Sequence, residues 1–326
     1  MIKYSFIIPV KEINDYIRES VLEILKIKRH DFEIIIYPDK TDNNENWDKT
    51  RQIATGPGGP AMKRSLSMRD AQGEILVFID DDSYPREDFL DKLDEGFKDS
   101  NIIAVGGPAI TPEDDSFWQK VSGAVFLSSL SGGCPERYIP IGEKRFIDDW
   151  PSVNLSIRKI DFDAINGFDS AYWPGEDTKL CIDLLDNRKG KILYDPGLIV
   201  YHHRREGLLR HLKQIGSYGI HRGFFAKKFP KTSLKFKYFV PTCFLFFVVI
   251  GGIASIYSNF ILKLYIIGWA LYLAGLIKAT WDIYKYEKNV LIILNAIYYI
   301  FFTHLIYGFR FLQGFVFTKE LKSKLR

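Results

Sequence analysis

The chain has 326 residues, of which 47% are hydrophobic and 26% are charged, and its formal net charge is +4. This composition excludes an intrinsically disordered chain, a collagen and a disulfide-rich mini-protein, and the small net charge gives no indication of nucleic-acid binding. The three cysteines form no Cys-x-x-Cys pair, so we expect neither a disulfide framework nor a zinc ribbon.

The first third of the chain alternates short apolar segments with amphipathic ones, which predicts strands separated by helices. Strands are expected at residues 4–10, 33–37, 75–79 and 102–105. Three helices are expected. The first has Ile17, Val21, Leu22 and Leu25 on one face, and the second covers residues 61–71. The third has Phe89, Leu90, Leu93 and Phe97 on one face. Strands that are apolar throughout indicate an α/β fold with a mostly parallel central sheet covered on both faces. In such sheets, ligands bind beyond the carboxyl ends of the strands.

Three consecutive carboxylates, Asp80, Asp81 and Asp82, follow the third predicted strand. Adjacent like charges repel, and a divalent cation such as Mn²⁺ or Mg²⁺ removes that conflict because it takes oxygen ligands and bridges carboxylates to phosphates. The alternative is a solvated acidic turn or a helix N-terminus, where aspartate is also favoured. The position directly after a buried strand favours the metal site.

A glycine-rich loop over residues 56–59 precedes two basic side chains, Lys63 and Arg64. The loop has neither the P-loop pattern nor the dinucleotide-binding glycine pattern, which favours a flexible loop. Lys63 and Arg64 either reach a diphosphate or lie on a solvated helix face.

The sequence Gly175-Glu176-Asp177 opens another predicted helix, and Trp173-Pro174 just before it would form an apolar lid. Acidic residues in a first helical turn compensate the helix dipole. Alternatively, Asp177 is a general base that deprotonates an acceptor hydroxyl.

A predicted strand over residues 198–201 runs into His202-His203-Arg204-Arg205. A lone histidine is usually structural, but a pair beside two arginines is suited to a metal and a diphosphate, since arginine binds phosphate with two hydrogen bonds.

In this order, the features resemble those of the family 2 glycosyltransferases of the GT-A fold, over about residues 3–225. They are the strand with Pro9, the strand ending in Asp39, Arg64 nine residues before Gly73-Glu74, Asp80-x-Asp82 with Pro85, Gly167-Phe168-Asp169, Gly175-Glu176-Asp177 and Val200-Tyr201-His202. The resemblance implies inverting transfer of a sugar from a UDP-, GDP- or dTDP-linked donor, dependent on Mn²⁺ or Mg²⁺.

The resemblance also implies roles for individual residues. The donor side would hold Pro9, Asp39, Arg64, Asp80 and Asp81, with Asp39 near the nucleoside base and Asp80 near the ribose or diphosphate. Asp82 and His202 would be the metal ligands. Asp177 would be the catalytic base, with Glu176 beside it. The possible diphosphate contacts would be Lys63, Arg204 and Arg205. The chain departs from the family pattern at Ser65, where asparagine is usual, and after Asp39, where Asp-Gly-Ser is missing. Both departures weaken the assignment of Asp39 and Arg64 to the nucleotide side of the donor.

The later part of the chain bears on the acceptor. Processive synthases carry Gln-x-x-Arg-Trp, whereas this chain has Gln214-Ile-Gly-Ser-Tyr, which argues against a processive polymerase. Residues 304–314 are similar to the tails of membrane-bound family members that extend exopolysaccharides or lipid-linked glycans. The acceptor is therefore expected to be a lipid-linked or growing glycan, with polyprenyl phosphate itself as the second possibility. A catalytically silent nucleotide-sugar-binding scaffold is the third.

Charge is distributed unevenly along the chain. Residues 238–318 contain seven of the 84 charged side chains (44 Lys and Arg plus 40 Asp and Glu). Apolar runs at 238–262, 264–277 and 289–309 predict two or three transmembrane or interfacial helices, because about 20 apolar residues suffice to cross a bilayer. We therefore expect a multi-pass protein of the cell membrane.

The basic residues set the expected topology. No secretory signal pattern is found, and five lysines between residues 227 and 237 precede the first run, so a cytoplasmic catalytic domain is expected. Three full spans would place the basic tail outside, so either the third run is interfacial or re-entrant, or the tail disobeys the positive-inside rule. The expected divisions are a GT-A domain at 1–228, a linker at 229–237, the apolar helices at 238–318 and a tail at 319–326.

Overall fold

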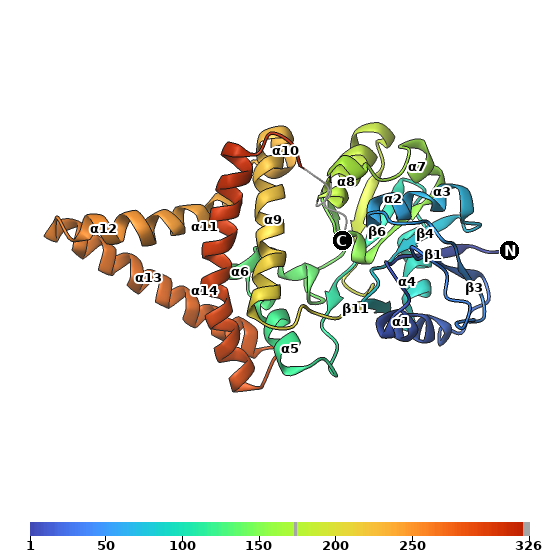
Figure 1. The fold of residues 1–326 in the computed structure, drawn as a ribbon, viewed down its shortest axis with the longest axis horizontal. Coiled ribbons are helices and arrows are strands. Elements are labelled where there is room, and N and C mark those ends of the chain that lie inside the picture. Colours follow the sequence, from blue (N-terminus) through green and yellow to red (C-terminus); the bar gives the residue numbers. More distant parts are fainter. Residues whose placement is uncertain (173–174, 322–326) are drawn as a thin grey trace. The chain divides into compact units, whose positions relative to one another are not determined.

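The computed structural model describes residues 1–172 and 175–321. The expected lid at Trp173-Pro174 and the last five residues of the basic tail lie outside these ranges. The fold divides into two compact units (Figure 1). The first unit comprises residues 1–112 and 139–203, and the second comprises residues 113–138 and 204–321.

An eight-stranded sheet forms the centre of the first unit. Its order is β3 (Thr50–Gln52), β2 (Phe32–Tyr37), β1 (Tyr4–Pro9), β4 (Ile75–Phe78), β9 (Leu155–Arg158), β6 (Ile102–Gly106), β10 (Lys191–Tyr194) and β8 (Arg145–Ile147). Strands β3, β2, β1 and β4 run parallel, as do β6 and β10. Strand β9 runs antiparallel between β4 and β6, and β8 is an antiparallel edge strand. The mostly parallel sheet expected from the four apolar segments is confirmed.

Helices cover both faces of this sheet. They are α1 (Asp15–Leu25), α2 (Pro60–Ser65), α3 (Ser67–Asp70), α4 (Phe89–Gly96), α7 (Lys159–Ala164) and α8 (Glu176–Arg188), with short 3₁₀ turns at Ser152–Asn154 (η3) and Ser170–Tyr172 (η4). One hydrophobic core lies between the sheet and helices α1 and α4. A second core lies on the opposite face of the sheet, beneath helices α7 and α8. Two expectations were wrong in detail. Leu22 was expected on the buried face of α1 but is 54% exposed, because that face is formed by Ile17, Ser20, Val21 and Ile24. The single helix expected over residues 61–71 is divided into α2 and α3 at Leu66.

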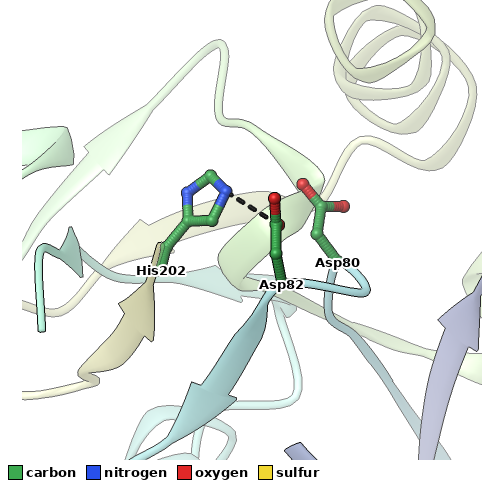
Figure 2. A group of neighbouring side chains, drawn as sticks. All are labelled: Asp80, Asp82 and His202. Atoms are coloured by element: carbon green, nitrogen blue, oxygen red, sulfur yellow. Dashed lines mark ion pairs between the residues drawn. The ribbon is translucent and has the colours of Figure 1, made fainter. Parts of the chain in front are cut away.

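A smaller sheet brings distant segments of the first unit together. It has the order β5 (Ser83–Pro85), β11 (Val200–His202) and β7 (Ala109–Ile110), with β5 antiparallel to β11. Its register pairs His202 with Ser83. Figure 2 shows the result: His202 at the end of β11 faces Asp82, which directly precedes β5.

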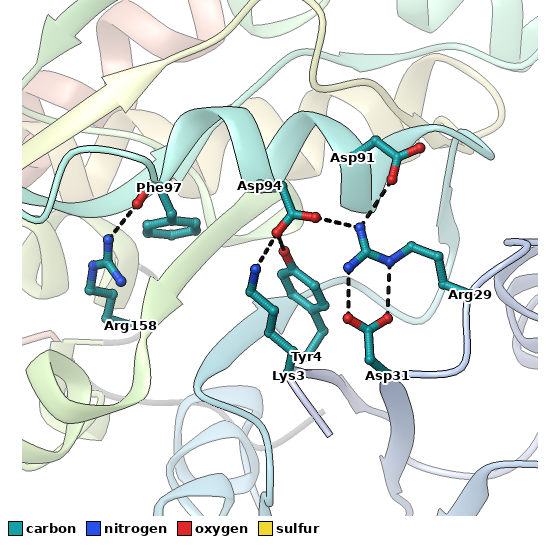
Figure 3. Close-up of polar contacts among 8 residues, drawn as sticks. All are labelled: Lys3, Tyr4, Arg29, Asp31, Asp91, Asp94, Phe97 and Arg158. Atoms are coloured by element: carbon teal, nitrogen blue, oxygen red, sulfur yellow. Dashed lines mark hydrogen bonds and ion pairs between the residues drawn. The ribbon is translucent and has the colours of Figure 1, made fainter. Parts of the chain in front are cut away.

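A network of charged side chains joins the start of β1 to α4 (Figure 3). The carboxylate of Asp94 accepts hydrogen bonds from Lys3, from the Tyr4 hydroxyl at 2.5 Å and from Arg29 at 2.5 Å. Arg29 also pairs with Asp31 at 2.6 Å. Burial alone raises the pKa of Asp94, but these three donors outweigh it and lower the pKa to about 2.

The lowered pKa of Asp94 predicts an acid-sensitive contribution to stability. Because the folded-state pKa lies below the unfolded value of about 3.9, the contribution is present above pH 4 and is lost as the pH falls towards 2. Asp94 is one-third exposed, so solvent screening reduces the effect, and we expect Asp94→Asn to lower the free energy of unfolding by about 1 kcal/mol at pH 7. Denaturant unfolding at pH 7, 4 and 3 checks this. The control is Asp91→Asn, whose carboxylate is 71% exposed. Equal losses in both variants, or a pH-independent loss, would contradict the expectation.

The second unit is helical. Its elements are α5 (Phe117–Ala124), η1 (Val125–Leu127), α6 (Ser129–Gly132), η2 (Pro135–Arg137), α9 (Leu208–Lys228), α10 (Pro230–Ser233), α11 (Phe236–Phe246), η5 (Phe247–Gly251), α12 (Gly252–Ser255), α13 (Asn259–Tyr284), α14 (Val290–Leu312) and η6 (Gln313–Phe317). Helix α9 ends at Lys228 and lies entirely within this unit.

Three continuous helices are long and apolar enough to cross a membrane: Phe236–Ser255, Asn259–Tyr284 and Val290–Phe317. The run expected at 238–262 is divided because Ser258 caps the start of α13 through the backbone N–H of Ile261. In the third helix, 39% of the most apolar window is buried, against 6% and 0% in the first two. The third helix therefore packs within the unit to a greater extent than the others.

Glycines allow α9 and α14 to pack closely, and Figure 1 shows the two helices side by side. A β-carbon at Gly219 would lie 2.9 Å from the Tyr307 carbonyl oxygen, and one at Gly223 would lie 2.1 Å from that of Phe311. This packing also gives a partner to Arg310, which directly follows the third apolar run, since its guanidinium donates to the Gly216 carbonyl at 3.4 Å.

This packing predicts different effects for the same substitution at two glycines of α9. Gly223→Ala should lower the melting temperature, because overpacking against rigid backbone costs about 1–3 kcal/mol. Gly216→Ala should leave it unchanged or raise it slightly, because its β-carbon would meet only Arg310 and Ile306 side chains at 3.4–3.6 Å, while alanine favours the helix by about 1 kcal/mol. Thermal unfolding in detergent checks both. Equal melting temperatures for the two variants would contradict close α9–α14 packing.

Candidate active site

The carboxyl ends of three neighbouring parallel strands meet at one edge of the main sheet. Strand β1 ends at Pro9, β2 is followed by Asp39, and β4 is followed by Asp80. The sequence predicted that all three residues lie on the donor side, and the topology places them along the same edge.

A tight turn holds the three aspartates between β4 and β5. The hydroxyl of Ser83 accepts a hydrogen bond from the Asp80 backbone N–H and donates one to the Asp80 carbonyl, both at 3.0 Å. The Ser83 carbonyl in turn accepts a hydrogen bond from Ser20 of α1 at 2.7 Å. The turn is thereby fixed to the body of the first unit.

Asp80, Asp82 and His202 form a compact group (Figure 2). One potential ligand atom from each side chain lies within 4.8 Å of the other two, and the imidazole Nε2 of His202 is 3.1 Å from Oδ1 of Asp82. Two carboxylate oxygens and one imidazole nitrogen are ligands that suit a divalent cation. The neighbouring His203 lies outside this group, since its Nε2 contacts Glu19 of α1 at 2.9 Å.

Lys63 and Arg64 are 2% and 3% exposed, so a solvated helix face is excluded for both. The ammonium of Lys63 donates to the Val10 carbonyl at 2.6 Å and pairs with Asp39. The guanidinium of Arg64 pairs with Asp80 and lies 3.8 Å from the Glu176 carboxylate. Arg64 therefore joins the aspartate turn to the start of α8.

The two acids at the start of α8 have different surroundings. Glu176 accepts a hydrogen bond from the Gly175 backbone N–H at 2.9 Å, and burial raises its pKa to about 7, aided by the charge of Asp177. Burial also raises the pKa of Asp177, while Arg64 and Ser152 act in the opposite direction. Among residues 1–172 and 175–321, Oδ1 of Asp177 is buried without a hydrogen-bond partner. A buried carboxylate oxygen of raised basicity is suited to accept a proton.

Sequence reasoning missed the segment that supports α8. Ser152 lies beside Asp177, and the carboxylate of Asp149 accepts a hydrogen bond from the Thr178 hydroxyl at 2.9 Å. No local pattern marked either residue, because their importance arises only where the chain folds against α8. The remaining predicted contacts, Arg204 and Arg205, belong to the second unit.

Comparisons with known proteins agree with this architecture. Residues 5–157 match the family described as "Glycosyl transferase family 2". A poly(ribitol-phosphate) beta-N-acetylglucosaminyltransferase of Staphylococcus aureus is 28% identical over 124 residues, which are 33% of this chain and 22% of that protein. A dolichyl N-acetyl-alpha-D-glucosaminyl phosphate 3-beta-D-2,3-diacetamido-2,3-dideoxy-beta-D-glucuronosyltransferase of Methanococcus voltae is 22% identical over 299 residues, which are 89% and 83% of the two chains. The match to the staphylococcal protein thus spans about a fifth of that relative's length.

A solved structure supports the fold over a larger part of the chain. A mannosyltransferase from Pyrobaculum calidifontis, in complex with GDP-mannose and Mn²⁺, covers 98% of this chain and 88% of its own at a TM-score of 0.55 and 14% identity. The mixed sheet with its acidic turn at the carboxyl edge is thus a nucleotide-sugar transferase fold of the GT-A type. Residues 5–157 therefore carry a family 2 glycosyltransferase domain, and the chain continues into three C-terminal helices long and apolar enough to span a membrane.

Proposed function

We propose that the chain is an inverting, divalent-metal-dependent glycosyltransferase. It transfers a sugar from a UDP-, GDP- or dTDP-linked donor to a lipid-linked or growing glycan at the cytoplasmic face of a membrane. The main observation behind this proposal is that Arg64 contacts both Asp80, a member of the group with Asp82 and His202, and Glu176. Asp177 directly follows Glu176 at the start of α8.

The donor set fits Mn²⁺ or Mg²⁺, with Asp80, Asp82 and His202 as the residues that would hold the ion. The imidazole favours Mn²⁺, because Mg²⁺ prefers oxygen ligands. When bound, the ion neutralises the charge that builds on the departing nucleoside diphosphate. Asp80 is thus proposed as a third metal ligand beside Asp82 and His202, whereas the sequence predicted a position near the ribose or diphosphate.

Asp177 is the proposed general base, because Glu176 is engaged by Arg64 and Gly175. Oδ1 of Asp177 takes the proton of the acceptor hydroxyl as that oxygen bonds to the anomeric carbon. The bond between this carbon and the diphosphate oxygen breaks in the same displacement, and the diphosphate leaves with the electron pair. A single displacement from the opposite face inverts the configuration.

Two observations support a lipid-linked acceptor. The relative from Methanococcus voltae, which this chain matches over 83% of its length, is named for a dolichyl-phosphate-linked sugar acceptor. The three apolar helices would hold the catalytic portion at a membrane, where confinement raises the effective concentration of such an acceptor. The five lysines between residues 227 and 237 support a cytoplasmic catalytic domain, with 1–228 as its extent and 229–237 as the juxtamembrane linker.

Nucleotide release from purified full-length protein tests the proposal. UDP-, GDP- and dTDP-sugars are each supplied with a polyprenyl-linked glycan, with Mn²⁺, with Mg²⁺ or with a chelator. The expected result is release with one donor class that requires both metal and acceptor, and a product whose anomeric configuration by NMR is opposite to that of the donor. Nucleotide release that does not depend on metal would contradict the metal-dependent mechanism. A product with the same anomeric configuration as the donor would contradict a single displacement. Absence of nucleotide release with any of the donors would support the catalytically silent scaffold.

A further inference from the structure

Two consecutive residues of helix α2 reach two different acidic groups at the carboxyl edge of the main sheet. Lys63 pairs with Asp39, which follows β2, whereas Arg64 pairs with Asp80, which follows β4. Because an α-helix has about 3.6 residues per turn, neighbouring side chains point in different directions, and one short helix reaches both strand ends. The strand order β2, β1, β4 places the two ion pairs two strands apart.

The ammonium of Lys63 is buried against the ends of β1 and β2. The side chain is 2% exposed, donates to the Val10 carbonyl at 2.6 Å and pairs with Oδ1 of Asp39. Val10 follows β1, and Asp39 follows β2. Both contacts therefore lie beside the metal group after β4 and not within it.

The backbone on both sides of Asp39 is also held in place. Its N–H donates to the Lys11 carbonyl at 2.9 Å, and its carbonyl accepts a hydrogen bond from the Gly56 N–H at 3.1 Å. The glycine-rich loop thus begins against the end of β2, and a β-carbon at Gly56 would meet no atom of the described residues within 4 Å. The Asp39 side chain is 22% exposed, so a ligand can reach this fixed carboxylate.

The spacing of the strands indicates which part of a donor lies at Asp39. Under the proposed function, on which this inference rests, the diphosphate lies at the metal group after β4. The end of β2 is about 10 Å away along the sheet edge, at about 4.8 Å per strand, and a nucleoside extends over a comparable length. On the other side of β4 the edge is occupied by Asn154, which is 1% exposed and donates to the Pro108 and Leu198 carbonyls. The base is therefore expected at Asp39.

The ion pair limits the hydrogen bonds that Asp39 can form with a base. An ionised carboxylate only accepts hydrogen bonds, and Oδ1 already accepts one from Lys63. Uracil and thymine have one ring N–H between two carbonyl groups, which suits the remaining oxygen. Guanine has two adjacent N–H donors that use both oxygens of a carboxylate, and one of them would face the ammonium. Cytosine has an unprotonated ring nitrogen, which a carboxylate repels because both groups are acceptors.

We propose that Lys63 determines nucleotide specificity by holding one oxygen of Asp39, and that the donor carries uracil or thymine. The donor is then UDP- or dTDP-linked and not GDP-linked. Lys63 acts on the base through Asp39, so it is a positioning residue that has no contact with the diphosphate. Without the lysine, the same aspartate would accept both N–H donors of guanine in a bidentate contact.

Isothermal titration calorimetry of the full-length protein in detergent with Mn²⁺ tests this inference. The probes are UDP, dTDP, GDP, CDP and UMP. The variants are Lys63→Met, which removes the ammonium from a side chain of similar length, and Asp39→Asn, which replaces one acceptor by a donor. The control is Lys40→Met, which removes the same charge from an exposed lysine next to Asp39. The melting temperature of each variant shows whether it folds.

The wild-type protein should bind UDP or dTDP at least about 10-fold more tightly than GDP or CDP, because each unmatched polar group at the base weakens binding. Lys63→Met should lower the preference for UDP over GDP about 10-fold, because both oxygens of Asp39 become available. Asp39→Asn should lower the preference for UDP over CDP, because an amide can donate to the ring nitrogen of cytosine and accept from its amino group.

The ratio of the UDP and UMP affinities separates a role at the base from a role at the diphosphate. In Lys63→Met this ratio should stay within about 2-fold of the wild-type value, because the lysine acts only at the base. Lys40→Met should change the affinity for each probe by less than about 2-fold.

Three results would overturn the proposal. The first is wild-type binding of GDP that is as tight as binding of UDP and dTDP, or tighter. The second is an unchanged preference for UDP over GDP in a folded Lys63→Met protein together with an unchanged preference for UDP over CDP in Asp39→Asn. The third is a larger loss of affinity for UDP than for UMP in Lys63→Met, which would indicate a diphosphate contact.

The same measurements separate this inference from the proposed function. The expected base preference without any sugar transfer would support the role of Lys63 and remove only the proposed glycosyltransferase function. Sugar transfer from a GDP-linked donor would support that function and remove only the inference about the base.

Discussion

Replacing Asp177 with asparagine is expected to lower the rate of sugar transfer by about 10²- to 10⁴-fold, the usual contribution of a general base. The substitution keeps the size of the side chain and removes its ability to accept the proton. Oδ1 of Asp177 is buried beside Ser152 with no partner among the described residues, so replacing the carboxylate by an amide should leave the turn at Asp80–Asp82 intact. Donor binding should therefore change little.

The measurement is a comparison of transfer rate and nucleotide dissociation constant in the wild-type and Asp177→Asn proteins. Asp186→Asn is the matched control, because it makes the same change at an exposed position of the same helix and should transfer at the wild-type rate. Loss of both transfer and nucleotide binding in a folded Asp177→Asn protein would remove its assignment as the base. A wild-type rate would do the same.

Replacing Asp82 with asparagine, or His202 with glutamine, is expected to lower transfer at least about 100-fold at limiting Mn²⁺. A cation supplies several kcal/mol of charge stabilisation to the departing diphosphate, and each 1.4 kcal/mol corresponds to a factor of ten. Both side chains offer a ligand atom within 4.8 Å of Asp80. Unlike Asp177→Asn, these variants should also lose metal-dependent nucleotide binding.

The neighbouring histidine provides the control for this prediction. His203 contacts Glu19 and lies outside the metal group, so His203→Gln should keep its response to Mn²⁺ even if the protein is less stable. The measurement is the rate as a function of Mn²⁺ concentration, together with the melting temperature of each variant. The metal assignment would be contradicted by identical Mn²⁺ titrations for His202→Gln and the wild-type protein.

Four strands of the main sheet, β1, β2, β4 and β6, could be predicted because each is a continuous apolar segment. Residues 75–79 are an example: all of them are buried, and the acidic turn follows directly. The antiparallel strand β9 was not predicted, since Leu155–Arg158 is short and ends in an arginine, and only its neighbours β4 and β6 make it a central strand. Local sequence does not encode that pairing.

The site residues were predicted from motifs, but the contacts among them were not. Asp82 and His202 meet because β5 pairs with β11 across more than 100 residues. Arg64 was predicted on the nucleotide side, but its contacts with Asp80 and Glu176 were not predicted. A basic residue at a helix face gives no sign in the sequence of whether it will meet solvent or two carboxylates.

The apolar runs gave the number of candidate spans but not how each one packs. The basic tail was the reason to consider an interfacial or re-entrant segment at residues 289–309, which also contain the polar residues Asn295 and His304. Protein contacts account for these side chains, since His304 contacts the Leu130 carbonyl at 2.9 Å and Asn295 donates to the Leu291 carbonyl at 2.8 Å. Polar residues in this run are therefore compatible with a continuous helix of membrane-spanning length.

The central claim is that Asp80, Asp82 and His202 hold one divalent cation for a nucleoside diphosphate. Electron spin-echo modulation of Mn²⁺ bound to the protein with GDP or UDP tests it most directly, because it detects an imidazole nitrogen on the metal. The account predicts nitrogen modulation that is present in the wild-type and His203→Gln proteins and absent in His202→Gln. Modulation that persists in His202→Gln, or that is missing from the wild-type protein, would contradict it.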